Sequence, residues 1–376
     1  MKRDYITFWR VVFWIIIAFG IYSTIIRFTQ GLGASTALRD EFPWGLWVGF
    51  DILCGVGLAA GGFTLTAMVY IFNIERYRPI IRPTVLTAFL GYALVSFGLL
   101  YDLGKPYRIW HAILWWNPHS VMFEVAWCVM LYSTVLALEF SPVILEYFGW
   151  KKPLKLIKNI TIPLVICGVI LSTLHQSSLG TLFLIVPQKL HPLWYTPLMP
   201  ILFFMSAIMV GLAMVIFESF LSCRAFNKKL ELPLLTEIGR ILLVAILVYG
   251  TVRIEDLLSR SAFSLLWNRS PESLLCMAEL IIGLAFPVML LYFDRVRRSP
   301  QGLYFSSILV ILGFVMNRLN ISITGMIGSS GYNYFPSWME ISITMLIIAV
   351  GFGIFSLAAR YLPIYGEPLN KRVVLN

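Results

Sequence analysis

The stretch ITIPLVICGVILSTLHQSSLGTLFLI, residues 160–185, decides the fold class of this chain. It is long enough to cross a bilayer, because about 20 apolar residues in a helix span a hydrocarbon core of about 30 Å. Its middle, LSTLHQSSLG (171–180), nevertheless contains six polar residues, including His175 and Gln176. The run therefore predicts a membrane helix that carries a histidine and a glutamine at a depth where water is not available to bond them.

The composition of the whole chain is that of a membrane protein. Of its 376 residues, 59% are hydrophobic and 13% charged, with a mean hydropathy of +0.82, whereas soluble domains are about 45–50% apolar and about 25% charged. The net charge of +10 does not indicate nucleic-acid binding, because the basic residues fall in short loops between apolar runs. The five cysteines lie in separate runs without CxxC spacing, so we expect neither an iron–sulfur cluster nor disulfides in this chain.

Ten apolar runs predict an all-α integral membrane protein, a bundle of about ten transmembrane helices that forms a single polytopic domain over residues 1–376. Proline stands at or near the start of most runs, where its missing N–H costs nothing. The first run lacks a small-residue cleavage site, so we interpret it as a retained helix rather than a signal peptide. The predicted helices are roughly 8–27, 44–72, 83–103, 121–147, 159–185, 197–221, 233–256, 270–293, 301–322 and 336–362.

The basic residues predict which side of the membrane each loop faces. Ten crossings place both termini on one side, and that side holds 19 of the 29 Lys and Arg residues, against 6 in the opposite loops. Loops rich in Lys and Arg stay in the cytoplasm, so we expect both termini to be cytoplasmic. The 19 residues are Lys2, Arg3, Arg10, Arg76, Arg78, Arg82, Lys151, Lys152, Lys155, Lys158, Arg224, Lys228, Lys229, Arg295, Arg297, Arg298, Arg360, Lys371 and Arg372.

The loops on the opposite, outer side are aromatic and poor in charge. They read FPWGLW (42–47), GKPYRIWHAILWWNPHS (104–120), VPQKLHPLWYTP (186–197) and TGMIGSSGYNYFPSW (324–338). An interfacial aromatic belt explains such loops, but the inner loops are nearly free of tryptophan, so the belt would be one-sided. Docking of an extracytoplasmic partner explains them equally well, and the sequence leaves both readings open.

Ionisable groups at membrane depth are costly and by default mark a pathway or a site. A helical rise of about 1.5 Å per residue places polar groups from seven helices in the outer third of the membrane. His175 and Gln176 fall roughly 12–15 Å below the outer end of their helix on the same measure. The other members of this outer set are Asp51, Asp102, Glu124, Arg253, Glu255, Arg318 and Glu340.

A second set of charged residues lies deeper or toward the inner side. Glu279 falls near the middle of its helix, where a carboxyl group is either a proton carrier or a protonated, hydrogen-bonded core residue. Glu237 and Arg240 are spaced i,i+3 and can form an intrahelical salt bridge. Together with Glu139 these residues make a proton path conceivable, whereas Glu218, near an inner helix end, is expected to snorkel to the interface.

The histidines restrict the choice of ligand. Haem b in a helical bundle normally takes axial histidines from helices, but His111, His119 and His191 all fall in outer loops. No HxxE or HxxxH spacing occurs within a helix, so we expect neither haem nor a metal site in this chain. A quinone fits better, because its tail dissolves in lipid and its two carbonyl oxygens need only a few donors. A histidine beside carboxylates can exchange the protons of such a ligand.

Four long segments resemble the NrfD/polysulfide-reductase (PsrC-like) family, and within it the ten-helix branch of HybB-, DsrP- and Hme-type membrane subunits. The resemblance spans nearly the whole chain. Some members of the family carry the label "b-type cytochrome", which the histidine pattern here does not support. The segments are FPWGLWVGFDILCGVGLAAGGF (42–63), LHQSSLGTLFLI (174–185), KLHPLWYTPLMPILFFMSAIMVGLAMVIFE (189–218) and YNYFPSWMEI (332–341).

This resemblance implies a multi-pass, quinone-reactive subunit of a respiratory complex in the cytoplasmic (inner) membrane of a prokaryote. Family members exchange electrons between menaquinone and a ferredoxin-like iron–sulfur subunit on the extracytoplasmic side. That subunit in turn serves a catalytic subunit of hydrogenase, heterodisulfide-reductase-like or other reductase type. Residues that match the motifs are carried into the site: Asp51, His175, Gln176, His191, Trp194, Trp338 and Glu340. Arg253, Glu279 and Arg318 lie outside the confidently matched part and enter on physical grounds alone.

The sequence thus predicts an electron-transport oxidoreductase subunit that binds menaquinone and is incomplete as an enzyme on its own. We hypothesise that His175 and Asp51 bond the quinone headgroup and carry its protons, while Glu124, Arg253 and Glu340 tune or relay them. The direction of electron flow, the catalytic partner and proton translocation stay open. Two rival readings are a secondary ion or solute transporter, which mid-membrane charges also suit, and a purely structural anchor for an iron–sulfur subunit.

Overall fold

The computed structural model describes residues 2–365, and for residues 2–7 the backbone alone. Every regular element in this part of the chain is helical, which confirms the all-α prediction. Ten helical segments are long and apolar enough to cross a membrane, and each coincides with one predicted run. Of the residues used to predict orientation, Lys371 and Arg372 lie outside the described residues, as do the side chains of Lys2 and Arg3.

The ten spans are numbered in chain order. Span 1 is α1 (Lys2–Gln30); span 2 joins η1 (Trp47–Cys54), α3 (Gly55–Leu58), α4 (Gly61–Thr66) and η2 (Ala67–Ile71); span 3 is η3 (Glu75–Tyr77) with α5 (Arg78–Asp102). Spans 4 to 7 are α7 (Val121–Phe148), α9 (Thr161–Leu184), α10 (Met199–Phe226) and α11 (Leu232–Ser259). Span 8 joins α12 (Pro271–Leu280), η6 (Ile281–Ala285) and α13 (Phe286–Tyr292); span 9 joins α15 (Pro300–Leu319), η7 (Asn320–Thr324) and α16 (Gly325–Ser330); span 10 is α17 (Trp338–Tyr361). The connections contain α2 (Leu32–Ser35), η4 (Pro106–Arg108), α6 (His111–Leu114), α8 (Lys151–Asn159), η5 (Ala262–Trp267) and α14 (Asp294–Arg297).

Serine starts four of the spans by the same local mechanism. The first backbone N–H groups of a helix have no partner within it, and a serine side chain before the first turn can accept from one of them. Such a cap begins α7, α12, α15 and α17. In α12 and α15 a proline follows the capping serine, at the one helical position where proline is favourable.

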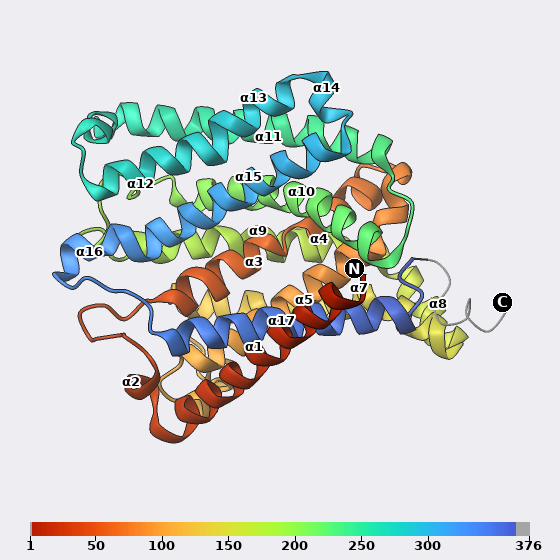
Figure 1. Ribbon diagram of the computed structural model, residues 1–376. Coiled ribbons are helices and arrows are strands. Elements are labelled where there is room, and N and C mark those ends of the chain that lie inside the picture. Colours follow the sequence, from red (N-terminus) through yellow and green to blue (C-terminus); the bar gives the residue numbers. More distant parts are fainter. Residues whose placement is uncertain (1, 366–376) are drawn as a thin grey trace.

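The spans pack as two groups of four with spans 1 and 10 beside them. Spans 2 to 5 contact one another, and so do spans 6 to 9, while α10 packs against both α9 and α4 and so joins the groups. Helix α1 pairs with α17, which also contacts α5. Figure 1 shows this order, with α11, α12, α13 and α15 in one part of the molecule and α1, α5 and α17 in the other.

Span 2 is the most enclosed of the ten. In its most apolar window 78% of the residues are buried, against 17% for spans 1 and 10. Small residues allow this close packing, since helices in a membrane approach most closely where side chains are small. A Cβ atom added at Gly61 would lie 3.0 Å from the carbonyl oxygen of Gly211, so glycine at both positions lets span 2 touch span 6. The motif-rich span 2 is thus the centre of the fold.

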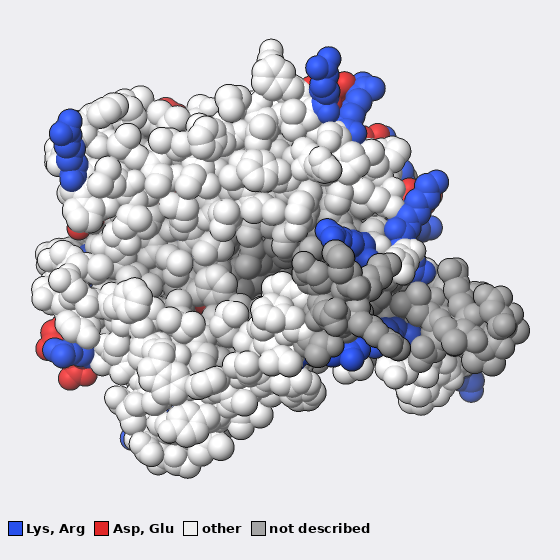
Figure 2. All heavy atoms as spheres, viewed as in Figure 1, with Lys and Arg blue, Asp and Glu red and all other residues white. Residues whose placement is uncertain are grey.

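The two ends of the bundle differ in charge. Helix α1 begins and α17 ends toward the same end, which also carries α8 and α14 (Figure 1). Figure 2 shows Lys and Arg gathered at that end and only a few at the other. Here these are called the basic end and the aromatic end, and the positive-inside rule predicts that the basic end is cytoplasmic.

This orientation predicts the labelling of single cysteines in a variant without the five native cysteines. Asn268→Cys, exposed at the aromatic end, should react with a membrane-impermeant maleimide in intact spheroplasts. Lys155→Cys, exposed on α8 at the basic end, should react only after the membrane is broken. Gel-shift detection of the label measures both, and the reverse pattern would contradict the orientation.

Candidate functional site

His175 is fully buried on α9 and is held by one hydrogen bond. Its Nδ1 lies 2.9 Å from the hydroxyl of Tyr92 on α5. Its Nε2 is buried and has no hydrogen-bond partner within residues 2–365. A buried ring nitrogen without a partner loses the free energy of a hydrogen bond that water would have given it. The contact with Tyr92 therefore orients the ring and leaves Nε2 free to bond a further group.

Two more proton-bearing side chains extend this contact toward the basic end. The ring of Tyr132, on α7, packs edge-on against Tyr92 with the centroids 4.7 Å apart. Ser172, one turn before His175, lies close to both tyrosine hydroxyls. The Tyr132 hydroxyl and Ser172 Oγ are likewise buried and unpartnered in the described part of the chain. His175, Tyr92, Tyr132 and Ser172 are called the histidine cluster below.

The neighbouring residues of α9 connect the histidine cluster to the rest of its group. Gln176 is buried and donates through Nε2 to the carbonyl oxygen of Val56, 3.2 Å away in span 2. Ser178 donates over 2.7 Å to Oε1 of Glu124, in the first turn of α7. The predicted outer carboxylate Glu124 thus lies one helical turn from His175 along α9. Gln176 and Ser178 thus each join α9 to another span.

Asp51 does not reach the histidine cluster. It is buried in η1, which is a π-helix, and accepts a hydrogen bond of 2.8 Å from Thr344 of α17. Its Cβ lies beside Gly98 on α5, six residues after Tyr92, which corresponds to about 9 Å along the helix. The structure therefore places Asp51 nearer the aromatic end than His175. π-Helical turns occur frequently at functional sites.

Glu340 fastens the N-terminal loop to α17. It forms a capping box with Ser337, and its Oε2 also accepts from the backbone N–H of Ala37, 2.9 Å away. Its Oε1 accepts from the hydroxyl of Tyr334, whose pKa is raised by burial and then by the adjacent carboxylate. Trp338, half exposed, stacks on Tyr22 of α1. Both residues are bound into the contact between spans 1 and 10 rather than to the histidine cluster.

A second buried polar network lies in the other group of spans. Glu279, on α12, accepts from Trp194 Nε1 at 3.0 Å, from Asn317 Nδ2 at 2.8 Å and from Asn320 Nδ2 at 2.9 Å. Asn317 in turn accepts over 2.6 Å from Arg318. Glu279, Trp194, Asn317, Asn320 and Arg318 are called the glutamate cluster below.

The hydrogen bonds of the glutamate cluster fill most of the capacity of Glu279. Three N–H groups donate to its two carboxyl oxygens. Arg318, fully buried, also donates to Ser206 and lies 3.7 Å from the Phe203 ring centroid. The amide of Asn317 thus links the carboxyl group of Glu279 to the guanidinium of Arg318.

Arg253 and the outer loops form a third network at the aromatic end. Arg253 donates to the carbonyl oxygen of Leu193 over 2.8 Å and lies 3.6 Å from Asp256. Asp256 also pairs with Arg260 at 2.6 Å and accepts from Thr196. Glu255, which the sequence placed in the outer set, is instead exposed, because Asp256 occupies the inward face of α11.

His191 is the predicted site residue of the loop before α10. Its Nδ1 accepts from the backbone N–H of Leu193, 3.2 Å away. Burial lowers the pKa of its imidazole, and nearby Glu272 opposes that shift. A lowered pKa favours the neutral ring that this hydrogen bond requires. His191 thus shapes the loop that carries Trp194 into the glutamate cluster.

The charged residues predicted on the inner side also have different partners and do not form one path. The predicted salt bridge between Glu237 and Arg240 is not formed: Glu237 pairs with Arg76 at 2.7 Å, and Arg240 lies 3.6 Å from Asp294. Each of the two side chains pairs with an opposite charge on another element. An intrahelical ion pair contributes only a few tenths of a kcal/mol, about 0.2–0.5 kcal/mol, so it is easily replaced by such a partner. Glu139 instead lines a cavity of about 590 Å³ between α5, α7, α8 and α9.

The predicted site residues therefore fall into separate networks. Sequence reasoning had placed them at a common depth, and it had no means of telling which side chains touch. It also missed Tyr92, Tyr132, Asn317, Asn320 and Asp256. Asn317 and Asn320 could have been found, because they flank Arg318 within an apolar run. The two tyrosines carried no signal, since tyrosine is common in membrane helices.

The chain resembles known membrane subunits over nearly its full length. The family model for polysulphide reductase, NrfD, matches residues 34–328. The chain is 32% identical to a protein of Escherichia coli K12 described as a probable Ni/Fe-hydrogenase 2 b-type cytochrome subunit, over 92% of this chain and 89% of that one. It is 29% identical to the integral membrane subunit of a menaquinone reductase from Nitratidesulfovibrio vulgaris Hildenborough, over 97% and 93% of the two chains. It is 21% identical to the integral membrane subunit of an Hdr-like menaquinol oxidoreductase from Archaeoglobus fulgidus, over 90% of each.

The glutamate cluster predicts a large loss of stability for Glu279→Leu. The substitution removes the acceptor of three buried N–H groups, and each buried donor left without a partner costs about 1–3 kcal/mol. Thermal unfolding of the purified protein in detergent should show a clearly lowered midpoint. Glu255→Leu, on the exposed face of α11, is the control and should change stability by less than about 0.5 kcal/mol. Equal effects of the two substitutions would contradict the role of Glu279 as the common acceptor of the cluster.

Proposed function

The chain belongs to the NrfD polysulphide reductase family, and from this premise we propose that it is the menaquinone-reactive subunit of a prokaryotic respiratory complex in the cytoplasmic membrane. It is a multi-pass membrane subunit of the oxidoreductase type. In the proposal it exchanges electrons between the quinone pool and an iron–sulfur subunit that docks at the aromatic end. Two of its relatives are named for menaquinone or menaquinol.

The observation that carries the proposal is the unpartnered Nε2 of His175. Bound menaquinone supplies or accepts two electrons and two protons at its two ring oxygens. A site for it needs a proton-exchanging donor inside the membrane, reachable from lipid because the quinone tail is apolar. His175 provides such a nitrogen, buried and already oriented by Tyr92. In the proposal this Nε2 bonds a quinone oxygen, since it has no other partner among residues 2–365.

The other predicted site residues take supporting roles in this proposal. Gln176 fixes α9 against span 2, and Glu124, joined to α9 through Ser178, is a proton acceptor on the outer side of His175. Asp51 is a second proton-exchanging carboxyl group nearer the aromatic end. Arg253 and Arg318 act as positioning residues. Arg253 holds the loop before α10 through the carbonyl oxygen of Leu193, and Arg318 holds span 9 against α10. The remaining members of the predicted site, His191, Trp194, Trp338 and Glu340, likewise hold loops in place.

We further propose that protons can reach the histidine cluster from the inner side through Glu139. Its carboxyl group lies in the cavity of about 590 Å³ that also contains Lys158 of α8. Tyr132 lies two turns before Glu139 in the same helix, α7, and belongs to the histidine cluster. The groups Glu139, Tyr132 and Tyr92 therefore lead from this cavity to His175. Glu279 lies outside this line because its hydrogen bonds are already occupied.

The partner surface is proposed at the aromatic end. The connection before α7 exposes Tyr107, Trp110, Trp115 and Trp116, each at least half exposed or close to it. A cavity of about 260 Å³ lies beside Trp44, Lys189 and Ser329. Trp44 packs against Phe183 of α9, two turns beyond His175. A redox partner docked here would be near the end of α9 that carries the histidine cluster.

His175→Ala should abolish quinone-linked turnover of the complex while the subunits still assemble. The loss should be at least about 100-fold, since a positioned proton-transfer group contributes about 10²–10⁴ in rate. Turnover is measured with a soluble menaquinone analogue in membranes, and assembly by co-purification of the other subunits. His119→Ala, in an exposed outer loop, is the matched control. Unchanged quinone turnover in His175→Ala would refute the proposal.

Two further outcomes distinguish the rival readings. Transport by the chain alone in liposomes, without partner subunits, would favour a secondary transporter. Full quinone turnover with the histidine cluster disrupted, together with normal assembly, would favour a structural anchor.

Glu139→Gln should slow the uptake of protons from the basic end without removing quinone binding. In proteoliposomes with a pH indicator on each side, the variant should show a several-fold lower rate of proton uptake at that end. Glu237→Gln, whose carboxylate is paired with Arg76 at the surface, should behave like the unmodified protein. Equal proton uptake by Glu139→Gln and the unmodified protein would exclude Glu139 as the entry point.

A further inference from the structure

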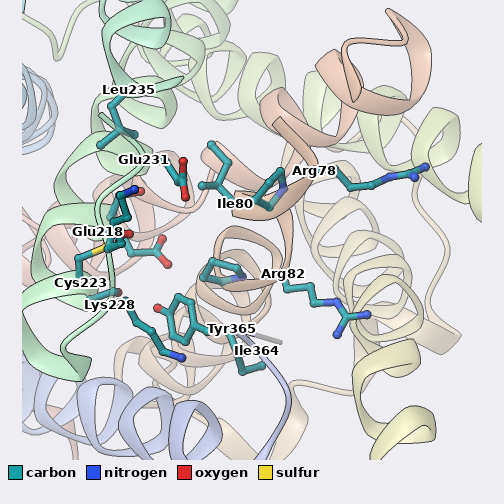
Figure 3. A pocket seen from close by; sticks show the side chains of 15 residues that line it. Arg78, Ile80, Arg82, Glu218, Cys223, Lys228, Glu231, Leu235, Ile364 and Tyr365 are labelled. Carbon is teal, nitrogen blue, oxygen red and sulfur yellow. The ribbon is translucent and has the colours of Figure 1, made fainter. Parts of the chain in front are cut away.

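A second cavity opens at the basic end and has no part in the proposed quinone chemistry. It has a volume of about 570 Å³ and lies between the start of α5, the end of α10 and the segment that leads into α11. Ile364 and Tyr365 close it from the C-terminal side. Figure 3 shows the side chains around it. The cavity is separated from the one containing Glu139 by the first turns of α5, which line both.

The cavity contains a carboxylate without a cation. Glu218 points into the space from α10 (Figure 3), and its Oε1 is buried without a hydrogen-bond partner in the described residues. Arg78 and Arg82 line the same wall but extend away from Glu218. Arg82 is engaged elsewhere, with Glu146 at 2.7 Å and the carbonyl oxygen of Pro363 at 3.0 Å. A buried carboxyl group in this position is stable as an anion only when a cation pairs with it, and the ammonium group of a ligand can supply that charge.

A phenol shares the cavity with this carboxylate. The hydroxyl of Tyr365 is buried and unpartnered within residues 2–365, and in Figure 3 it lies on the same side of the cavity as Glu218. Burial raises the pKa of the Tyr365 phenol; nearby Ser222 opposes that shift, and Glu218 adds to it. The hydroxyl therefore keeps its proton at neutral pH and can donate a hydrogen bond to an anionic oxygen.

Two lysines lie at the same cavity. Lys228 and Lys229 line it, and neither belongs to an ion pair in the part of the chain described here. The ammonium of Lys228 lies 5.8 Å from the centre of the Tyr365 ring. The cavity thus has two acidic residues in its lining, Glu218 and Glu231, together with basic residues on both sides, and the apolar part of its wall includes Pro79, Ile80 and Leu235.

We propose that this cavity binds the headgroup of an aminophospholipid from the inner leaflet. The primary ammonium of the lipid donates to Glu218, and its phosphate is bound by Lys228, Lys229 and the hydroxyl of Tyr365. An acyl chain of the lipid follows the apolar part of the cavity wall. Basic pockets between helices on the cytoplasmic side commonly bind lipid headgroups. An anionic lipid without an amine would bring no cation to Glu218, so the acid selects the amine.

The test is retention of defined lipids by the full-length protein in nanodiscs. Equal amounts of phosphatidylethanolamine, phosphatidylcholine and phosphatidylglycerol are supplied, the protein is washed in detergent, and bound lipid is measured by mass spectrometry. Phosphatidylethanolamine should be retained about tenfold or more over the other two, because only its headgroup has an ammonium that can donate a charge-assisted hydrogen bond to Glu218. Glu218→Gln should reduce this preference to less than about twofold, whereas Glu139→Gln, in the neighbouring cavity, should preserve it.

Two further arms keep the proposal falsifiable if Glu218→Gln fails to fold. Tyr365→Phe and the double substitution Lys228→Gln with Lys229→Gln should each weaken retention of phosphatidylethanolamine several-fold. Free O-phosphoethanolamine, which has the headgroup without the chains, should not displace the lipid at millimolar concentration. Equal retention of the three lipids, an unchanged preference in Glu218→Gln, or displacement by the free headgroup would each overturn the proposal. All readouts are lipid binding, so they are independent of quinone turnover.

Discussion

A polar side chain inside the hydrocarbon core must find its hydrogen bonds within the protein, and the arrangement of this chain depends on that constraint. Water is absent there, so each unsatisfied donor or acceptor costs free energy that a soluble protein would recover from solvent. The chain has only a small share of charged residues, yet it buries Arg27, Arg253, Arg318, Asp256 and Glu279. Those burials explain which spans pack together, because the partners of each charge come from neighbouring spans or from the loops that cover them.

The two groups of spans meet this constraint differently. In the glutamate cluster every oxygen of Glu279 accepts a hydrogen bond, and Arg318 lies against two aromatic rings and a serine. That network is closed and gives rigidity. In the histidine cluster the hydroxyl of Tyr132, Oγ of Ser172 and Nε2 of His175 stay unpartnered in the part of the chain that the structure describes. Buried polar groups without partners are rare in folded proteins, and three together in one place favour a site that a ligand or proton traffic completes.

The sequence predicted the fold closely, because apolar length and loop charge are local properties. All ten spans were foreseeable from runs such as 160–185, and the family from its long motifs. The site was less predictable. The position of a residue along its helix gives its depth in the membrane, but it does not show which side chains at that depth face one another. Asp51 and His175 share the outer half of the membrane, yet η1 directs Asp51 toward Thr344 of α17. Glu237 and Arg240 have ideal helical spacing, yet each is drawn to a partner on another element. These outcomes depend on contacts between elements that are distant in sequence. Local sequence patterns such as hydrophobic runs and i,i+3 spacing do not reveal such contacts.

The central claim is that menaquinone reacts beside His175, and photoaffinity labelling with an azido-menaquinone analogue tests it most directly. The analogue would be irradiated with the intact complex in membranes, and the labelled peptides of this chain mapped by mass spectrometry. The account predicts label in α9 and α5, around His175 and Tyr92, and its loss in the presence of excess unmodified menaquinone. Competable label confined to spans 6 to 9, around the closed network of Glu279, would contradict it.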